Sequence, residues 1–258
     1  MGKLKIAGAT VNQTPLDWQG NFSRITDAIS EAKNQGADLV CFPELALTGY
    51  GSEDLFLSYW YPKKALDQLE KLLPFCHDIV VAVGLPVRLE DKVYNTVAVI
   101  ENSEVKGFVA KQFMAIDGVH YEFRWFTPWE HGKVIQFEYQ GNQIPFGDLV
   151  LEKNGIKYGF EICEDAWRGE VRPGYRLRER KVDLIFNPSA SHFAMGKSIL
   201  REQLVNESSK LFDATYFYVN LLGNEAGRMI FDGEILASKH GKLILKNELL
   251  SFEDFQVL

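Results

Sequence analysis

Cysteine is scarce in this chain, and its scarcity excludes several classes of protein. Only 3 cysteines occur among 258 residues. An odd, widely spaced set provides neither a disulfide framework nor the paired spacing of a structural zinc site. We therefore expect a protein of a reducing compartment, the cytoplasm.

Long apolar runs and an excess of positive charge are also missing. No window approaches the roughly 18 apolar residues of a membrane span, and Met1 leads directly into a strand-like segment rather than into a signal peptide. The net charge of −7 argues against a broad surface for nucleic acid or anionic membrane. The basic run at 172–181 alternates with glutamates, so we interpret it as a solvated helix face. We expect neither nucleic acid nor membrane as a partner.

Hydrophobic residues, in contrast, are abundant enough to fill a substantial core, at 46% with 18 Phe and 5 Trp. Apolar periodicity predicts strands at 5–10, 39–42, 79–85, 94–100, 105–110, 157–162, 184–186 and 216–220. Helical spacing predicts helices at 21–35, 61–75 and 197–212; the last gathers its apolar residues on one face, namely Ile199, Leu200, Leu204 and Leu211. Helices and strands alternate at both ends around a strand-only centre, which predicts a layered α/β fold with mixed sheets. We expect a single domain over 1–258, with 112–133 as a functional loop.

Cys163 ends one of these strands and stands before an acidic turn. Tyr158, Phe160 and Ile162 alternate along the strand, which would hold the thiol rigidly beside a loop. This placement makes Cys163 a candidate nucleophile. The alternative is a small buried hydrophobic residue, the usual state of an unpaired cysteine.

Two further reactive groups follow other predicted strands. Pro43 closes one strand, so Glu44 projects just past its end among apolar neighbours that would raise its pKa toward that of a general base. Lys111 ends another strand, where its ammonium could stabilise a thiolate and a developing oxyanion. Glu44 could instead be a turn carboxylate, and Lys111 a solvated surface residue. If the three strands run the same way, the three groups share one rim of the sheet.

The five histidines have no metal-ligand spacing. His120 and His192 fall in loops, and we interpret both as surface or supporting residues rather than catalytic bases. Cys, Glu and Lys supply a nucleophile, a base and an oxyanion stabiliser without them. We expect no metal and no cofactor.

Three motifs together resemble the nitrilase, or carbon-nitrogen hydrolase, superfamily. They are Cys-Phe-Pro-Glu-Leu-Ala-Leu-Thr-Gly-Tyr at 41–50, the lysine motif at Lys111, and Glu-Ile-Cys-Glu-Asp-Ala-Trp at 161–167. The resemblance implies a four-layer α-β-β-α sandwich. It also implies a catalytic triad of Glu44 as base, Lys111 as oxyanion stabiliser and Cys163 as nucleophile, with Glu122 as a second glutamate. The implied reaction forms a thioester, releases ammonia or an amine, and ends in hydrolysis.

Within this superfamily the chain is most similar to the glutaminase domain of glutamine-dependent NAD synthetases. The similarity includes Glu-Asp-Leu at 53–55, Asn-Pro-Ser-Ala-Ser at 187–191, Gly-Lys at 196–197 and Phe-Asp-Gly at 231–233. It implies a substrate pocket surrounded by Tyr50, Glu164, Trp167, Ser189, Ser191 and Lys197. Residues 187–191 also fit an ordinary strand-to-helix turn with polar caps.

The chain departs from these relatives in two places. Asp117 stands where the family has a tyrosine that shapes the glutamine site, and it would either repel a substrate carboxylate, attract a cationic substrate or face solvent. The Ser-Gly-Gly-x-Asp-Ser loop that holds ATP in NAD synthetases does not occur in the sequence. We therefore expect that the protein either supplies ammonia to a separate synthetase or acts as a free-standing amidase.

The leading prediction is a cysteine-dependent amidohydrolase of a small linear carboxamide resembling glutamine. Two alternatives stay open, namely an amidase or carbamoylase for an amine-bearing substrate and a catalytically idle binding subunit. Transfer of the acyl group to an amine rather than to water is also open. Because members of the superfamily pair into larger sandwiches, we expect a homo-oligomer, at least a dimer.

Overall fold

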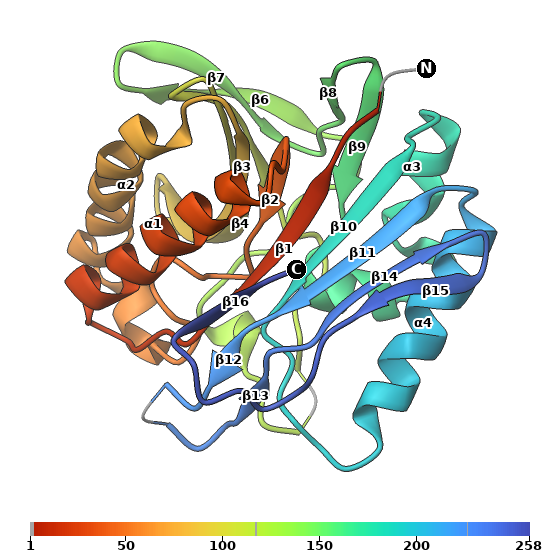
Figure 1. The fold of residues 1–258 in the computed structure, drawn as a ribbon. Helices are drawn as coiled ribbons and strands as arrows, with labels where there is room; N and C mark the ends of the chain where they lie inside the picture. The colour runs from red at the N-terminus through yellow and green to blue at the C-terminus, as the bar shows by residue number, and fades with distance from the viewer. Residues whose placement is uncertain (1–2, 117, 226) are drawn as a thin grey trace.

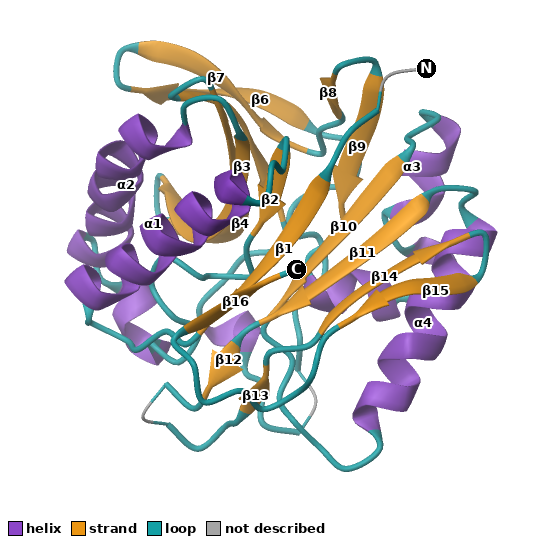
Figure 2. Ribbon diagram, viewed as in Figure 1, coloured by secondary structure: helices purple, strands orange, loops and turns teal. Residues whose placement is uncertain are grey.

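The computed structural model describes residues 3–116, 118–225 and 227–258. Within them, two mixed β-sheets lie face to face between two pairs of helices (Figure 1). Helices α1 (Trp18–Asn34) and α2 (Trp60–Leu72) cover one sheet, and α3 (Gly174–Glu179) and α4 (Lys197–Leu211) cover the other (Figure 2). The predicted four-layer α-β-β-α sandwich is therefore confirmed.

The first sheet has eight strands in the order β16-β1-β2-β3-β4-β5-β7-β6. Their bounds are β1 Ile6–Val11, β2 Leu39–Cys41, β3 Val80–Leu89, β4 Lys92–Glu101, β5 Glu104–Ala110, β6 Val134–Tyr139, β7 Asn142–Gly147 and β16 Phe255–Val257. Strands β1, β2 and β3 are parallel, whereas β3, β4 and β5 form an antiparallel meander. Two reversals after β3 mean that β2 and β5 point the same way.

The second sheet has six strands in the order β15-β14-β11-β10-β9-β8. Their bounds are β8 Leu151–Lys153, β9 Ile156–Phe160, β10 Leu184–Ser189, β11 Thr215–Asn220, β14 Ile235–Lys239 and β15 Lys242–Lys246. A two-stranded ribbon joins β12 (Leu222–Gly223) to β13 (Phe231–Asp232). Single 3₁₀ turns occupy Glu53–Leu57, Leu73–Cys76, Glu122–Arg124, Cys163–Trp167 and Gly169–Val171.

Hydrophobic periodicity explains how the helices pack on the sheets and how the two sheets pack on each other. Asp17 caps the N-terminus of helix α1, where its carboxylate accepts the amide proton of Gly20 at 2.9 Å, and the helix buries Ile25, Ala28 and Ile29 against the first sheet. Between the sheets, Phe186 of β10 packs on Phe160 of the neighbouring strand. Valine and alanine side chains of β3 and β4 meet these rings from the other sheet.

The apolar face that the spacing predicts on α4 is largely exposed. Helix α4 buries Arg201, Val205, Ser208 and Ser209, and its apolar residues Ile199, Leu200 and Leu211 are exposed. The ionic partners of Arg201 lie beneath the helix, at Asp232 and Glu234, and they determine which face turns inward.

The interpretation of the basic run at 172–181 as a solvated helix face is wrong in part, because three of its arginines pair with buried carboxylates. The Arg172 guanidinium is buried against Glu161, and Arg176 and Arg180 both pair with the buried carboxylate of Asp148. None of the helices in the described ranges is long and apolar enough to cross a membrane.

Candidate active site

Glu44, Lys111 and Cys163 follow the ends of three strands, but the strands belong to both sheets. Glu44 follows β2 and Lys111 follows β5, which are parallel members of the first sheet. Cys163 follows β9 in the second sheet. The expectation of one shared rim is therefore corrected: the three groups come from the facing ends of two stacked sheets.

The Glu44 carboxylate is completely buried and has three donors. Lys111 Nζ lies 2.5 Å from Glu44 Oε1, and Asn95 Nδ2 donates to the same oxygen at 2.6 Å. The amide of Ala190, at the end of β10, donates to Glu44 Oε2 at 2.9 Å. Glu44 does lie in a turn, but its carboxylate is buried among donors rather than exposed to solvent.

The Glu122 carboxylate flanks the same ammonium from the loop that follows β5. Lys111 Nζ lies 2.8 Å from Glu122, and both side chains are fully buried. Tyr50 Oη donates to Glu122 Oε1 at 2.8 Å, and the Ala115 amide donates to Oε2 at 3.0 Å. Lys111 therefore bridges two buried carboxylates, and the alternative of a solvated surface lysine is excluded.

Burial and mutual charge set the ionisation of this cluster. Burial raises the pKa of Glu44, while the positive charge of Lys111 opposes the shift. Burial on its own would lower the pKa of Lys111, but the charges of Glu122 and Glu44 outweigh it and raise that pKa well above its ordinary value. Lys111 is therefore a permanent cation between two acids.

The surroundings of Cys163 disfavour its thiolate. Burial and then the negative charge of Glu44 raise the pKa of this thiol well above its ordinary value, and Lys111 acts in the opposite direction. A neighbouring base is consequently needed before the sulfur can attack.

Asp165 connects the strand end that carries Lys111 to the turn that carries Cys163. Its Oδ1 accepts the amide protons of Gln112 and Phe113 at 3.0 and 2.7 Å, and its Oδ2 accepts that of Ile162 at 2.9 Å. Cys163 itself has a φ of +46°, an uncommon value for a residue with a side chain. The Asp165 bonds support this turn and fix the thiol relative to Lys111.

A cavity of about 230 Å³ opens at Cys163. It is lined by Ala115, His120, Cys163, Glu164, Trp167, Ser191, His192, Lys197 and Leu200. Four of the pocket residues expected from the resemblance thus lie on its wall: Glu164, Trp167, Ser191 and Lys197. The cavity is smaller than the roughly 300–1,000 Å³ of sites for drug-sized ligands, so it suits a small molecule.

The other expected pocket residues lie elsewhere. Tyr50 is buried behind His120, and its hydroxyl contacts Glu122 rather than the cavity. Ser189 is buried at the end of β10, with its hydroxyl directed toward Asn187. Asp117 lies outside the described residues.

Sequence reasoning underrated the two loop histidines. His120 is 6% exposed, and its Nδ1 lies 2.9 Å from Tyr50 Oη. Its Nε2 lies 3.0 Å from His192 Nδ1, and Lys197 Nζ lies 3.3 Å from the same His192 nitrogen. Their interpretation as supporting residues agrees with the structure for His120, but no local sequence pattern announces the pairing, since 72 residues separate the two rings.

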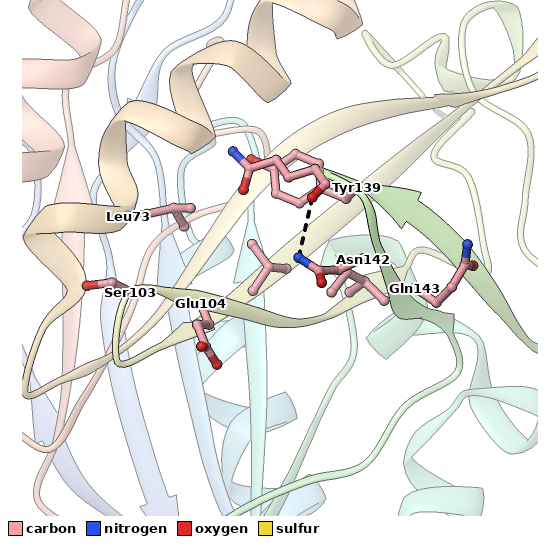
Figure 3. A pocket seen from close by; sticks show the side chains of 9 residues that line it. Leu73, Ser103, Glu104, Tyr139, Asn142 and Gln143 are labelled. Atoms are coloured by element: carbon pink, nitrogen blue, oxygen red, sulfur yellow. Dashed lines mark hydrogen bonds between the residues drawn. The ribbon is translucent and has the colours of Figure 1, made fainter.

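A second cavity, of about 340 Å³, lies far along the first sheet, beside the β6–β7 hairpin (Figure 3). Tyr139, Asn142, Gln143, Ser103, Glu104 and Leu73 surround it, and no reactive cluster faces it. The described ranges also contain no group of three or more His, Cys, Asp or Glu side chains that could hold a metal ion. The cavity at Cys163 opens beside the buried cluster of Glu44, Lys111 and Glu122, and for that reason it is the candidate active site.

Comparison with known proteins defines the class. The sequence model of the carbon-nitrogen hydrolase family matches residues 5–249, and the chain belongs to this family. It is thus an enzyme of the group that hydrolyses carbon-nitrogen bonds, as the motifs predicted.

Particular relatives are glutamine-dependent NAD(+) synthetases. The chain is 31% identical to a putative enzyme of this name from Schizosaccharomyces pombe, over 99% of this chain and 38% of that protein. It is 32% identical to the Drosophila melanogaster enzyme, over 34% of that protein. The chain therefore spans less than two fifths of the length of these relatives.

Solved structures agree with both the fold and the resemblance. A glutamine-dependent NAD(+) synthetase from Cytophaga hutchinsonii superposes with a TM-score of 0.93 at 48% identity, over 100% of this chain and 42% of that one. An amidase from Nesterenkonia superposes with a TM-score of 0.80 at 21% identity, over 99% of this chain and 92% of that one, which shows the shared fold.

Proposed function

We propose that the protein is a cysteine-dependent amidohydrolase that releases ammonia from glutamine. The single observation that carries the proposal is the buried Lys111 ammonium bridging Glu44 and Glu122 next to the Cys163 thiol. Such a cluster provides a base, a nucleophile and a fixed positive charge in one water-poor site.

The proposed acylation begins when Glu44 takes the thiol proton as the sulfur attacks the amide carbonyl. Lys111 stabilises the negative charge that develops on the carbonyl oxygen. The tetrahedral intermediate collapses as Glu44 returns the proton to the leaving nitrogen, which departs as ammonia and leaves a thioester on Cys163. Glu44 then removes a proton from water, which attacks the thioester, and the carboxylic acid is released with the thiol restored.

Charged groups of both signs on the cavity wall support an amino-acid substrate. Glu164, whose Oε1 pairs with Arg168 Nη2 at 2.7 Å, lies on the same wall as the nucleophile and suits an α-ammonium group, and Lys197 suits an α-carboxylate. Trp167, which is 41% exposed, offers an apolar face to the intervening methylenes. Glutamine carries its α-ammonium and α-carboxylate at one end and its side-chain amide at the other, so the charged groups can bind the cavity wall while the amide meets Cys163.

The test is ammonia release from a panel of amides at neutral pH. The panel holds glutamine, asparagine, uncharged butyramide and a cationic amide such as lysinamide. We expect glutamine to have the highest kcat/KM and Cys163→Ala to lose all detectable turnover, whereas Cys76→Ala, at a buried cysteine in a different element, keeps it. Full turnover by Cys163→Ala would refute the proposed chemistry.

Lys197→Met tests the substrate assignment separately. If Lys197 binds the substrate carboxylate, the variant raises KM for glutamine and leaves KM for butyramide unchanged. Equal changes in KM for glutamine and for butyramide would show that Lys197 does not bind a substrate carboxylate. A preference of the parent enzyme for the cationic amide would favour the second candidate, an amidase or carbamoylase for amine-bearing substrates, and Asp117→Tyr would then shift that preference back to glutamine.

Several features beyond the site extend the proposal. The three described cysteines are unpaired and buried, which fits a reducing compartment such as the cytoplasm. The exposed apolar residues of α4, Ile199, Leu200 and Leu211, fit a contact between copies of the chain in a homo-oligomer. The ammonia that the enzyme releases would pass either to a separate synthetase or to solution. Residues 1–258 are proposed to act as one domain.

A further inference from the structure

An unbroken chain of hydrogen bonds runs from Glu122 to the wall of the cavity. Tyr50 Oη lies 2.8 Å from Glu122 Oε1 and 2.9 Å from His120 Nδ1. His120 Nε2 lies 3.0 Å from His192 Nδ1. Both imidazoles line the cavity, whereas Glu122 is fully buried beside Lys111.

The hydroxyl proton of Tyr50 determines the direction of hydrogen-bond donation at the Glu122 end of the chain. Glu122 Oε1 already accepts from Lys111 Nζ at 2.8 Å and Oε2 from the Ala115 amide at 3.0 Å, so both carboxylate oxygens act as acceptors. The single hydroxyl proton of Tyr50 must therefore point to Glu122. The Tyr50 oxygen is then free only to accept, and the donor must be His120 Nδ1–H.

The remaining protons follow from the neutrality of His120. Burial lowers the pKa of His120 to about 4, and the charge of Glu122 offsets only part of the shift. The positive charges of Lys111 and Lys197 and the neighbouring His192 act in the same direction as burial. A neutral ring with Nδ1 protonated has a lone pair at Nε2, which accepts a hydrogen bond from His192 Nδ1–H. The Lys197 ammonium lies 3.3 Å from His192 Nδ1 and 3.4 Å from His192 Nε2, and in this arrangement it donates to the Nε2 lone pair.

We propose that Tyr50, His120 and His192 form a one-way donor chain that positions Glu122 and, through it, the Lys111 ammonium at Glu44. All three donors point inward, toward the carboxylate. Reversal of the chain would require one additional proton, carried by Glu122, and would remove one of the two anions that hold Lys111. The effect of the donor chain on catalysis rests on the proposed function, whereas the direction of its hydrogen bonds does not.

The tautomer of His120 provides a direct test that needs no turnover. In ¹⁵N-histidine-labelled protein at pH 7, long-range ¹H–¹⁵N spectra distinguish Nδ1–H, Nε2–H and doubly protonated rings, and His120→Gln identifies the His120 signals. We expect the neutral Nδ1–H form. Tyr50→Phe, which removes the acceptor, should shift the ring toward Nε2–H. An Nε2–H or doubly protonated His120 in the unsubstituted protein would overturn the proposal.

Kinetics of two His120 variants separate positioning from general support of the fold. A glutamine side chain offers both a donor and an acceptor, whereas phenylalanine offers neither. A hydrogen bond involving a charged group is worth roughly a 10- to 100-fold change in rate. We expect His120→Phe to lose about that factor in kcat with little change in KM, and His120→Gln to recover most of it.

The control is His240→Phe, because the His240 side chain is largely exposed and should tolerate the change. Unchanged kcat in His120→Phe, or equal losses in both His120 variants, would contradict the positioning role. The two proposals also fail separately. A protein with no amidase activity but an Nδ1–H His120 refutes the proposed function alone, and an active, Cys163-dependent enzyme with the other tautomer refutes only the donor chain.

Discussion

Glu44 is the proposed general base, and both half-reactions depend on its carboxylate. Three donors converge on its carboxylate, and burial nevertheless raises its pKa above the ordinary value of 4.5. When it is ionised, a desolvated carboxylate is a stronger base than one in water. Its position past Pro43 was visible in the sequence; the donors from β4 and β10 were not.

Replacement of this carboxylate provides the first prediction. Glu44→Gln cannot accept the thiol proton, so kcat should fall by roughly 10²- to 10⁴-fold. Stopped assays of ammonia release measure the loss, and thermal unfolding checks that the variant is folded. A loss of less than about threefold would exclude Glu44 as the base.

The pH profile provides the second prediction. Activity requires ionised Glu44, and its raised pKa means that kcat/KM declines as the pH falls, with the acid limb above 4.5 rather than below it. The profile is measured with glutamine at constant ionic strength, over a range in which unfolding is shown to be absent. An acid limb at or below the ordinary glutamate value would show that the base is not desolvated.

At the scale of elements, a close approach of β3 to the turn after β2 fixes Glu44. Gly84 stands where a Cβ atom would lie 2.3 Å from the Leu45 nitrogen and 2.5 Å from the Pro43 oxygen. The Gly84 carbonyl accepts the amide proton of Leu47 at 3.0 Å. Only glycine lets the two backbones lie this close together.

Gly84→Ala is therefore the third prediction. The added methyl must displace the turn that carries Glu44, so we expect kcat to fall at least tenfold, because small misplacements of reacting groups are costly. Gly227→Ala is the matched control, since its Cβ would meet no described atom closer than 3.5 Å. Equal activity in the two variants would show that the turn can move without consequence.

The elements also show where sequence reasoning succeeds. Every predicted strand and helix is present, because each carries a strong apolar period, and the loop at 112–133 indeed contains Glu122 and His120. The β6–β7 hairpin was not predicted: its strands are mostly exposed, with only partial burial of alternate residues such as Ile135 and Phe137. Half-exposed strands leave a weak pattern.

The sequence could not say which face of α4 turns inward, for a different reason. Periodicity gathers the apolar residues on one face without assigning that face to the core, and Arg201 turns inward to two acids that lie more than 30 residues away in the sequence. Pairings over such separations depend on the assembled fold. The same limit hid the contact of His120 with His192, whereas the proposed triad could be predicted because each member follows a recognisable strand and stands in a motif that resembles the family.

At the scale of the molecule, the site depends on how the two sheets are held together. Phe186 of β10 is fully buried between them and contacts the rings of Phe160 and Phe217. Ala190, which donates to Glu44, lies just beyond the same strand. Packing between the sheets thus sets the distance between Cys163 and its partners.

The fourth prediction tests this packing. Phe186→Ala should lower the free energy of unfolding by about 3–5 kcal/mol, the usual cost of truncating a buried aromatic residue. Phe252→Ala, at a fully exposed ring, should change it by less than about 0.5 kcal/mol. Urea denaturation followed by tryptophan fluorescence compares the variants, and similar stabilities would place the structural core elsewhere.

The central claim, that Cys163 attacks the amide carbonyl of glutamine, is tested most directly by mass spectrometry of the acid-quenched enzyme during turnover. We predict one adduct per chain with the mass of a glutamyl group, located on the peptide that contains Cys163, and none in Cys163→Ala. Ammonia release without an adduct on Cys163, or an adduct on another residue, would contradict the account.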